Sequence, residues 1–309
     1  MDPREVSRRE YERRIGRVLD YIRDHLDEDL SLRTLARVAN FSPYHFHRVF
    51  RAMVGEPVGT FVRRLRILTA AHHLAADGTR PITSIARECG FSSSSAFARE
   101  FRNHFGVSAS AYRKASTGRE SKDRQLERKI GEDADLLPAY TDAMTSQGKA
   151  RDIKMAVEVK ELPELHVAYI RHVGPYNTIG KAFGKLMGWA GPRGLLRFPE
   201  TKVLAVYHDN PDVVEEAKLT SSACITVPKA TPVAGGAETM TIPGGLFAVA
   251  HVEIASDQFG AAWNALMQWL STSGYQPDDR MCYEVYLNDH EAHPEKKFIL
   301  DICEPIRPL

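Results

Sequence analysis

The first part of the sequence contains one segment twice. Residues 30–51 read LSLRTLARVANFSPYHFHRVFR, and residues 82–102 read ITSIARECGFSSSSAFAREFR. In both copies an Ala-Arg pair is followed by a Phe-Ser pair and then by the pattern F-x-R-x-F-R. An internal repeat constrains the fold strongly, because both copies must form the same structure. The pattern predicts a short helix, a turn closed by the Phe-Ser pair and a second helix, so that each copy is a helix-turn-helix motif.

The second helix of each motif is predicted to have one buried face and one outward face. At helical spacing the phenylalanines fall on one side, which we expect to pack in the core. The opposite side carries Arg48 and Arg51 in the first copy and Arg99 and Arg102 in the second. An outward arginine usually marks only a solvated surface, but its repetition favours DNA binding. In the major groove an arginine can bond guanine O6 and N7, and each good contact contributes about 1–3 kcal/mol of discrimination.

The charge of the chain is divided unevenly along its length. Residues 1–115 hold 20 Lys and Arg against 13 Asp and Glu, whereas the remaining residues hold 21 against 27. A basic module followed by an acidic one indicates that the first meets a polyanion and that the second has another role. The length of 309 residues also favours two domains. We therefore expect a DNA-binding domain at 1–115, a polar linker at 116–152 and a second domain, with another role, at 153–309.

The composition argues against membrane, metal and disulfide chemistry. No apolar run approaches the length of a membrane span, and the first residues lack the apolar stretch of a secretory signal, so we expect a cytoplasmic protein with no membrane partner. The four cysteines lack the spacing of zinc ligands. His45 and His47, and also His72 and His73, point in different directions on a helix. We therefore expect buried thiols, no metal site and no cofactor.

Capping residues and apolar spacing place the other helices of the first domain. Residues 6–26 predict a first helix, and Ser31 and Ser42 are the expected N-caps of the two helices in the first motif. Residues 60–75 predict a connector helix between the two motifs, with a basic outer flank. The residues of that flank are Arg63, Arg64 and Arg66.

Residues 11–114 resemble the DNA-binding domain of the AraC/XylS family of bacterial transcription regulators. The resemblance implies two helix-turn-helix motifs that read successive major grooves about 34 Å apart on one DNA face. The positions that carry the match are Ala36, Phe41, Ser42, Phe46, Arg48 and Phe50 in the first copy and Ile85, Ala86, Gly90, Phe91, Ser92, Phe97, Arg99, Phe101, Gly106, Tyr112 and Arg113 in the second.

The resemblance also implies which residues face the bases, and the two copies differ there. These positions are Tyr44, His47 and Arg48 in the first copy and Ser94, Ser95 and Arg99 in the second. A run of four serines at residues 92–95 replaces longer amide side chains in the second copy. Short hydroxyls reach phosphate or water more readily than base edges, so we expect the first copy to contribute more sequence specificity.

The second half of the chain holds another internal repeat, at an offset close to 80 residues. Residues 161–174 parallel residues 241–254, and each half reads strand, strand, helix, strand, strand. We expect two such halves to pair their sheets around a pseudo-twofold axis, with a ligand cleft between them. The complete prediction is a multidomain protein, with an all-α double helix-turn-helix domain followed by an α+β domain of two β-β-α-β-β repeats.

Positions where the two halves differ are the most informative about a site, because shared residues can serve the fold alone. Glu284 stands where the first half has Ala205, and Asp301 stands where it has Cys224. Period-two alternation puts Glu284 and Tyr286 on one strand face. We expect Val206 and Val285 to pack under the helices, which leaves the carboxylate and the tyrosines toward the cleft. A carboxylate among aromatic rings suits a cationic, planar or lipophilic ligand, whereas the alternative is an exposed glutamate with no role.

This half resembles the effector-binding domains named after the gyrase inhibitory protein, which also occur in multidrug-responsive regulators. VGPY at 173–176 and YEVYLND at 283–289 carry the match. The resemblance implies that Glu284 lies in a ligand pocket. The other pocket candidates are Tyr286, Tyr169, Tyr176, Asp301 and Trp263, although Trp263 or Trp269 could instead be core.

The sequence therefore predicts a transcription regulator and not an enzyme. Its expected partners are double-stranded DNA, a small, cationic or lipophilic effector, and RNA polymerase. Two alternatives stay open for the second domain. Some relatives of such domains hydrolyse reactive small molecules, and Glu284 could position a water as general base. Gyrase-inhibiting relatives suggest instead a module that docks a protein.

Overall fold

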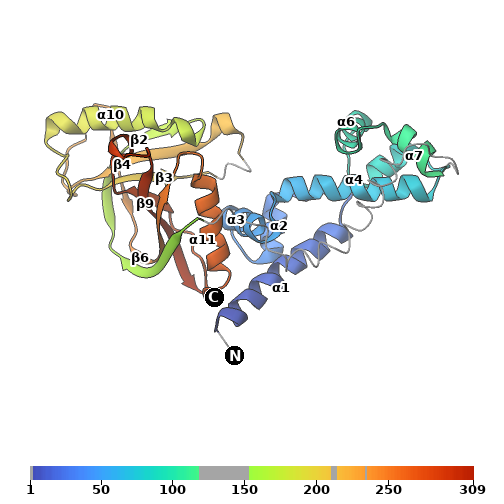
Figure 1. The fold of residues 1–309 in the computed structure, drawn as a ribbon, viewed down its shortest axis with the longest axis horizontal. Helices are drawn as coiled ribbons and strands as arrows, with labels where there is room; N and C mark the ends of the chain where they lie inside the picture. The colour runs from blue at the N-terminus through green and yellow to red at the C-terminus, as the bar shows by residue number, and fades with distance from the viewer. Residues whose placement is uncertain (1–2, 118–152, 210–213, 234) are drawn as a thin grey trace. The chain divides into compact units, whose positions relative to one another are not determined.

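The computed structural model describes residues 3–117, 153–209, 214–233 and 235–309 (Figure 1). The chain divides into two compact units. We call residues 11–148 the helical unit and residues 149–309, together with residues 1–10, the sheet unit. The predicted linker at 116–152 lies outside the described residues except for its first two positions, which end a helix.

The described part of the helical unit is all α, as predicted. The first motif is α2 with α3, the second is α5 with α6, and α4 joins them (Figure 1). Helix α1 begins earlier than the expected residue 6 and also ends earlier than residue 26. The helices are α1 (Pro3–Asp24), α2 (Leu32–Ala39), α3 (Pro43–Val54), α4 (Val58–Ala76), α5 (Ile82–Glu88), α6 (Ser94–Phe105) and α7 (Ala109–Thr117).

Serine caps start four of these helices, and at α7 the Ser108 hydroxyl accepts a hydrogen bond from the backbone N–H of Ala111 at 3.2 Å. The Ser31 hydroxyl accepts a hydrogen bond from the backbone N–H of Thr34 at 3.2 Å, and the Ser42 hydroxyl accepts one from that of His45 at 3.4 Å. Both predicted caps are therefore confirmed. Ser93 caps α6 in the same way, because its hydroxyl accepts from a backbone N–H at 3.2 Å. Each cap satisfies one of the backbone donors that a helix N-terminus leaves without an intrahelical partner.

Helix α4 belongs to the apolar cores of both motifs. Near its start, Phe61 packs against Phe50 of the first motif with ring centroids 5.6 Å apart. Near its end, Leu68 and Leu74 join the core of the second motif, in which Phe101 is fully buried. The predicted basic flank of α4 is only partly correct, because Arg64 forms an ion pair with Glu56 at 2.5 Å and Arg66 is half-buried.

No helix in the described part of the chain is long and apolar enough to cross a membrane.

The sheet unit is built from two β-β-α-β-β halves, as predicted. The first half contains β1 (Met155–Leu162), β2 (Leu165–Val173), η1 (Tyr176–Thr178), α10 (Gly180–Ala190), η2 (Gly191–Arg193), β3 (Val203–Tyr207), η3 (Glu216–Lys218) and β4 (Thr220–Thr226). The second half contains β5 (Glu238–Ile242), β6 (Gly245–Ile254), α11 (Phe259–Leu270), β7 (Tyr275–Pro277), β8 (Tyr283–Tyr286), η4 (His290–Ala292) and β9 (Phe298–Pro308).

The order of the strands has the expected pseudo-twofold symmetry. The sheet reads β1-β6-β9-β8-β3-β4-β2-β5, with β7 attached to β9. If each strand is replaced by its counterpart in the other half, the same order is obtained, read from the opposite edge of the sheet. The first strand of each half pairs with the second strand of the other half, so the halves are interlocked. The axis passes between β3 and β8, where Ala205 and Glu284 are direct cross-strand partners.

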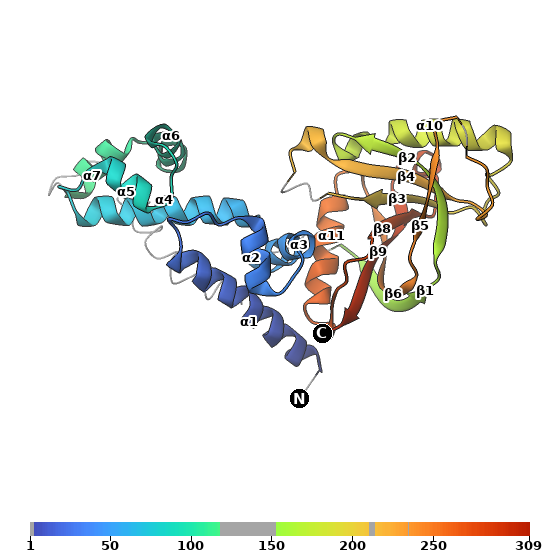
Figure 2. The ribbon, with the colours of Figure 1, turned by 180° about the vertical axis from the view of Figure 1, so that it is seen from behind.

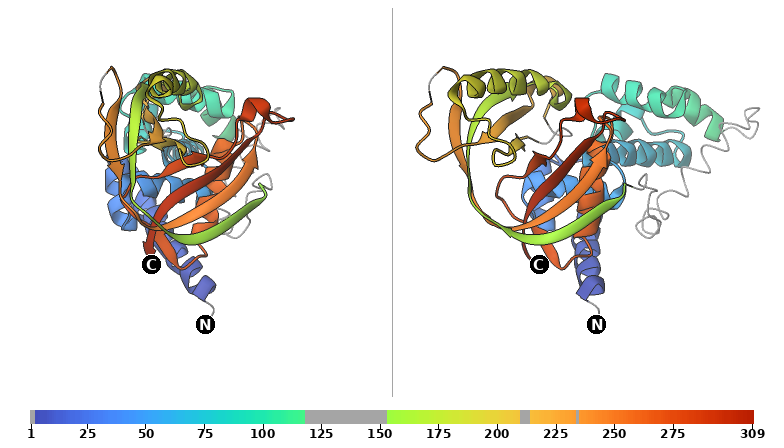
Figure 3. Two further views of the ribbon diagram at one scale, coloured as in Figure 1. Left: turned by 90° about the vertical axis from the view of Figure 1, so that its left-hand side faces the viewer. Right: turned by 60° about the vertical axis from the view of Figure 1, so that its left-hand side comes forward.

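Figures 2 and 3 show that the sheet is curved. Each of its faces has its own core. On one face, Ala205 and Ala223 pack with Leu186 and other residues of α10, because alanine lets a helix approach closely. The opposite face contains Val206, and Val285 packs against the same cluster. The expectation that Val206 and Val285 lie under the helices is therefore wrong, since the smaller side chains occupy that position.

Candidate functional site

The outward side of α3 carries three of the four residues predicted to contact DNA in the first motif. The Arg48 guanidinium lies 4.6 Å from the ring centroid of Tyr44, which holds the charge over an aromatic face. Arg51 is exposed one helical step further along. His47 lies on the same helix and is buried, with only 1% of it exposed. Tyr44, Arg48 and Arg51 are thus the accessible ones among the four predicted residues.

All four residues predicted to contact DNA in the second motif are exposed on α6. Ser94, Ser95, Arg99 and Arg102 lie on its outer side. The Arg99 side chain is 71% exposed and lies 3.8 Å from a carboxylate oxygen of Glu100. The Ser95 hydroxyl lies 3.2 Å from that of Ser93, the N-cap residue. The short hydroxyls therefore stay close to the start of the helix, and the two arginines, Arg99 and Arg102, have the longest reach.

We predict that Arg48 contributes more to sequence specificity than Arg99. Arg48→Ala should remove about 1–3 kcal/mol of discrimination at one or two base pairs, because a stacked guanidinium is already oriented for guanine. Arg99→Ala should weaken binding to all sequences more evenly. Base-by-base binding measurements with both variants test this expectation. A larger loss of discrimination from Arg99→Ala would contradict it.

Glu284 of β8 is the centre of a polar cluster on the helix-covered face of the sheet. It is 1% exposed, and it shares this face with its cross-strand partner Ala205. One carboxylate oxygen accepts hydrogen bonds from the hydroxyls of Tyr207 at 2.7 Å and Tyr286 at 2.9 Å. The other accepts one from the indole N–H of Trp263, on α11, at 2.6 Å. Three donors from three different elements therefore surround this carboxylate.

The two tyrosines remain hydrogen-bond donors across the ordinary pH range. Burial, together with the charge of Glu284, raises the pKa of both Tyr207 and Tyr286 well above the usual value. The hydroxyls therefore stay protonated and point a partial positive charge at the carboxylate. Hydrogen bonds to the ionised form of a carboxylate favour that form.

Further aromatic rings extend the cluster beyond these donors. Tyr176 packs against Tyr207 at a centroid distance of 4.8 Å. Phe183 meets Tyr286 edge to face at 5.7 Å, and Phe298 lies 6.1 Å from the same ring. We call the set of Glu284, Tyr207, Tyr286, Trp263, Tyr176, Phe183 and Phe298 the carboxylate cage.

Four of the six predicted effector residues belong to this cage, and two do not. Tyr169 lies in the core of the opposite face, where its hydroxyl donates to Glu238 at 2.7 Å. Asp301 is the cross-strand partner of Val285, which also faces that side, and it pairs with His251 at 2.8 Å. Tyr169 and Asp301 are therefore separated from Glu284 by the sheet itself.

Tyr207, Phe183 and Phe298 are the members of the cage that were not predicted as site residues. In the internal repeat Tyr207 corresponds to Tyr286, since Ala205 corresponds to Glu284. The symmetry itself was the useful signal, because an axis beside Glu284 brings both copies of this tyrosine to one carboxylate.

The cage has the chemistry of a site for an organic cation. A buried negative charge attracts a cation strongly in a low-dielectric surrounding, and the faces of aromatic rings add cation–π attraction. The described residues contain no cluster of His, Cys, Asp or Glu side chains that could hold a metal ion.

Comparisons with known proteins assign a family model to each half of the chain. Residues 155–307 match the model described as a GyrI-like small molecule binding domain, and residues 35–115 match a helix-turn-helix domain. DNA gyrase inhibitor 2 of Dickeya dadantii (strain 3937) is 34% identical over 139 residues, which are 44% of this chain and 87% of that protein. The HTH-type transcriptional activator AarP of Providencia stuartii is 38% identical over 104 residues, which are 34% of this chain and 76% of that protein.

Solved structures similar to the chain include two of one protein. The crystal structure of the EcmrR C-terminal domain covers 50% of this chain and 99% of its own, with 20% identity and a TM-score of 0.42. The cryo-EM structure of an EcmrR–DNA complex covers 70% of this chain and 85% of its own, with 18% identity and a TM-score of 0.46.

Proposed function

The chain belongs to the AraC-type helix-turn-helix regulators that carry a GyrI-like small-molecule binding domain, and we propose that its effector is an aromatic or lipophilic organic cation held at Glu284. The helical unit supplies sequence-specific DNA binding through its two motifs. The sheet unit supplies the response to the small molecule.

The observation that carries this proposal is the burial of one carboxylate among aromatic rings. An ionised carboxylate removed from water is costly unless it is paired or hydrogen-bonded. Tyr207, Tyr286 and Trp263 supply three hydrogen bonds to the Glu284 carboxylate, and all three donors are neutral side chains. A bound cation would pair with the negative charge of the carboxylate, and the flat rings of the cage would accommodate an apolar, planar body.

The same geometry supports binding over catalysis. A general base must accept a proton from a water or substrate within hydrogen-bond reach. In the cage both oxygens of Glu284 already accept hydrogen bonds from protonated side chains. We therefore propose a sensor and not a hydrolase. Turnover of small reactive esters by the full chain, lost in a Glu284→Gln variant, would contradict this.

We propose RNA polymerase as the further partner and the cytoplasm as the location. A relative named as a transcriptional activator, AarP, supports the first expectation. A DNA-binding regulator works where the chromosome and the polymerase are, which supports the second. The effector can alter transcription only if it binds one of two states of the protein more tightly than the other.

Binding of a defined cation tests the proposal directly. We expect tetraphenylphosphonium to bind the full chain and its neutral analogue triphenylphosphine oxide to bind at least roughly tenfold more weakly, because only the cation pairs with the carboxylate. Tryptophan fluorescence provides a readout, since the Trp263 indole donates to Glu284. Equal affinity for the charged and neutral compounds would contradict the proposal.

A further inference from the structure

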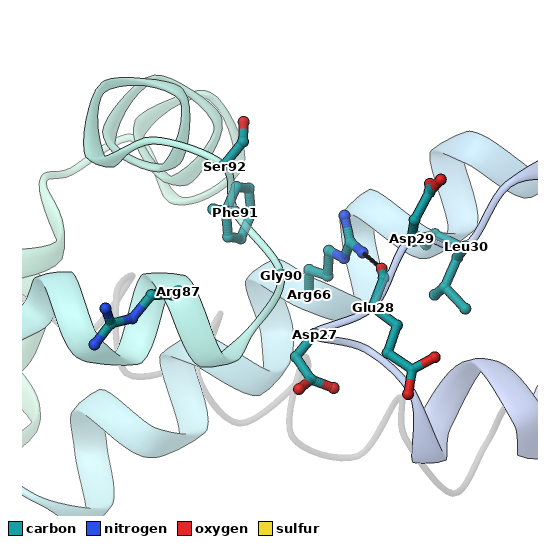
Figure 4. Close-up of a pocket in the computed structure, with 10 residues that line it drawn as sticks. Asp27, Glu28, Asp29, Leu30, Arg66, Arg87, Gly90, Phe91 and Ser92 are labelled. Atoms are coloured by element: carbon teal, nitrogen blue, oxygen red, sulfur yellow. Dashed lines mark hydrogen bonds between the residues drawn. The ribbon is translucent and has the colours of Figure 1, made fainter.

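Three segments of the helical unit meet at one point between the two helix-turn-helix motifs. They are the loop after α1 that leads into the first motif, the middle of α4, and the turn between α5 and α6 of the second motif. Figure 4 shows this region, with Arg66 reaching from α4 toward the loop and Gly90 beside it. The second motif therefore lies against the loop that leads into the first motif, in addition to sharing α4 with it.

Arg66 ties the middle of α4 to the loop before the first motif. Its Nε donates to the backbone oxygen of Leu26 at 2.9 Å, and its Nη2 donates to that of Glu28 at 2.8 Å. A planar guanidinium bonding two carbonyls in a fixed fork restricts direction as well as distance. Arg66 follows Leu65 and precedes Ile67, so it lies where α4 passes from one core to the other.

Gly90 brings the second motif against the same two groups. Its φ is +79°, which favours glycine. A Cβ atom at this position would lie 2.1 Å from the oxygen of Leu26 and 2.6 Å from Nε of Arg66. Both distances are below any real van der Waals contact, and the first partner is backbone, which cannot turn away. The turn can therefore approach the loop this closely only because residue 90 has no side chain.

A cavity adjoins the contact between Arg66 and Gly90. A cavity of about 390 Å³ is lined by Asp27, Glu28, Asp29, Leu30, Val62, Arg66, Arg87, Gly90, Phe91 and Ser92 (Figure 4). Its lining comes from the loop before the first motif, from α4 and from the second motif, and it contains three carboxylates and two arginines. Arg66 and Gly90 thus connect α4 and the second motif to the loop that leads into the first motif.

We propose that Arg66 and Gly90 are positioning residues that fix α6 relative to α3, and thereby set a strict distance between the two half-sites on DNA. The inference rests on the proposed reading of two successive major grooves by one chain. One inserted base pair moves a half-site by about 3.4 Å and turns it by about 35° around the helix axis. A rigid junction cannot follow that change, whereas a loosened junction can.

The experiment compares binding to DNA sites whose half-site spacing differs by one or two base pairs. The best site is first selected from random DNA with the full wild-type chain, and binding is then measured by fluorescence anisotropy at fixed salt. We expect the wild-type chain to lose roughly tenfold or more in affinity for each shifted spacing, as for a lost base contact. In Arg66→Gln and Gly90→Ala this penalty should fall to about threefold or less, with retained preference for the base sequence within each half-site.

Two matched variants separate this role from general destabilisation. Gly106→Ala places alanine at a similar φ of +76°, but nothing lies within 4 Å of its Cβ. Arg64→Ala removes a guanidinium of the same helix whose ion-pair partner, Glu56, lies in the connection between α3 and α4. Both should keep the strict spacing profile. Arg66→Gln keeps the test valid if Gly90→Ala does not fold.

The outcomes are distinct. Loosened spacing in both test variants, with strict spacing in both controls, supports the inference. A penalty in Arg66→Gln and Gly90→Ala equal to that of the wild type overturns it, while the two-groove proposal stands. Equal loosening in Gly106→Ala overturns it as well. A wild-type chain that contacts one half-site only overturns the two-groove reading and this inference together.

Discussion

Glu284→Gln is expected to weaken the binding of a lipophilic cation by roughly 30- to 150-fold, or about 2–3 kcal/mol. The substitution keeps the shape of the side chain and removes its charge. The neutral amide can still contact Tyr207, Tyr286 and Trp263, so the cage should remain packed. The lost affinity would therefore report the electrostatic attraction between the carboxylate and the ligand. Isothermal titration with tetraphenylphosphonium measures it.

Glu238→Gln is the matched control for this experiment. Glu238 also accepts a hydrogen bond from a tyrosine hydroxyl, that of Tyr169 at 2.7 Å, but on the opposite face of the sheet. We expect its affinity for the cation to stay within about twofold of the wild type, because charge pairing needs direct proximity. A Glu284→Gln variant that binds within about threefold of the wild type would place the effector elsewhere. A loss in Glu238→Gln of the same size would favour the face that contains Tyr169.

The helical unit could be predicted almost completely from its repeat. Residues such as Phe50 and Phe101 follow the 3.6-residue period, and this period decides which side of a helix is buried. The cap at Ser42 could be read from local sequence as well. The burial of His47 could not be predicted, because helical spacing puts this residue beside the outward ones and only contacts outside the helix bury it.

Long-range hydrogen bonds between side chains and the backbone also could not be predicted from the sequence. Arg66 was expected to be solvated, yet it bonds carbonyls about 40 positions earlier in the chain. No periodic pattern reports such a contact, since the acceptors are backbone oxygens that every residue carries. The glycine that accompanies it, Gly90, gave a turn signal but no indication of what it approaches.

In the sheet unit, comparing the two halves located Glu284 but assigned the wrong sides of the strands. Strands β3 and β8 have buried residues on both faces, so alternation of polar and apolar residues does not indicate which face the helices cover. Larger side chains such as Val206 were assigned to the helix side. The reverse is found, because Ala205 packs with α10 whereas Val206 and Val285 pack in the core of the opposite face.

Arg280→Ala is expected to destabilise the sheet unit by about 3 kcal/mol and to lower its melting temperature by roughly 6–12 °C. The Arg280 side chain is 20% exposed and donates to the Asp278 carboxylate at 2.7 Å. It also donates to the backbone oxygens of Gly244, Leu246 and Ile306, at 2.7, 2.9 and 3.2 Å. Truncation would leave three carbonyls and a carboxylate without these bonds.

The position of this arginine explains why its loss should affect the whole unit. Its guanidinium joins the turn before β6 to the end of β9, and it lies 4.9 Å from the ring of Phe247 in the core of the sheet. Gly245 passes close to it with φ at +128°, and a Cβ there would lie 2.4 Å from Nη1 of Arg280. The backbone can therefore pass this close to the Arg280 guanidinium because residue 245 has no side chain.

Tryptophan fluorescence isolates this unit, because all three tryptophans of the sequence, Trp189, Trp263 and Trp269, lie within it. Arg197→Ala is the control, since Arg197 is exposed and donates one bond, to Gly194, at 3.2 Å. It should change stability by less than about 0.5 kcal/mol. If Arg280→Ala also changes the stability by less than about 1 kcal/mol, the pairing of β6 with β9 must keep the turn before β6 and the end of β9 together without the arginine. Arg280→Lys should lie between these values, because an ammonium group retains the charge but cannot span three carbonyls.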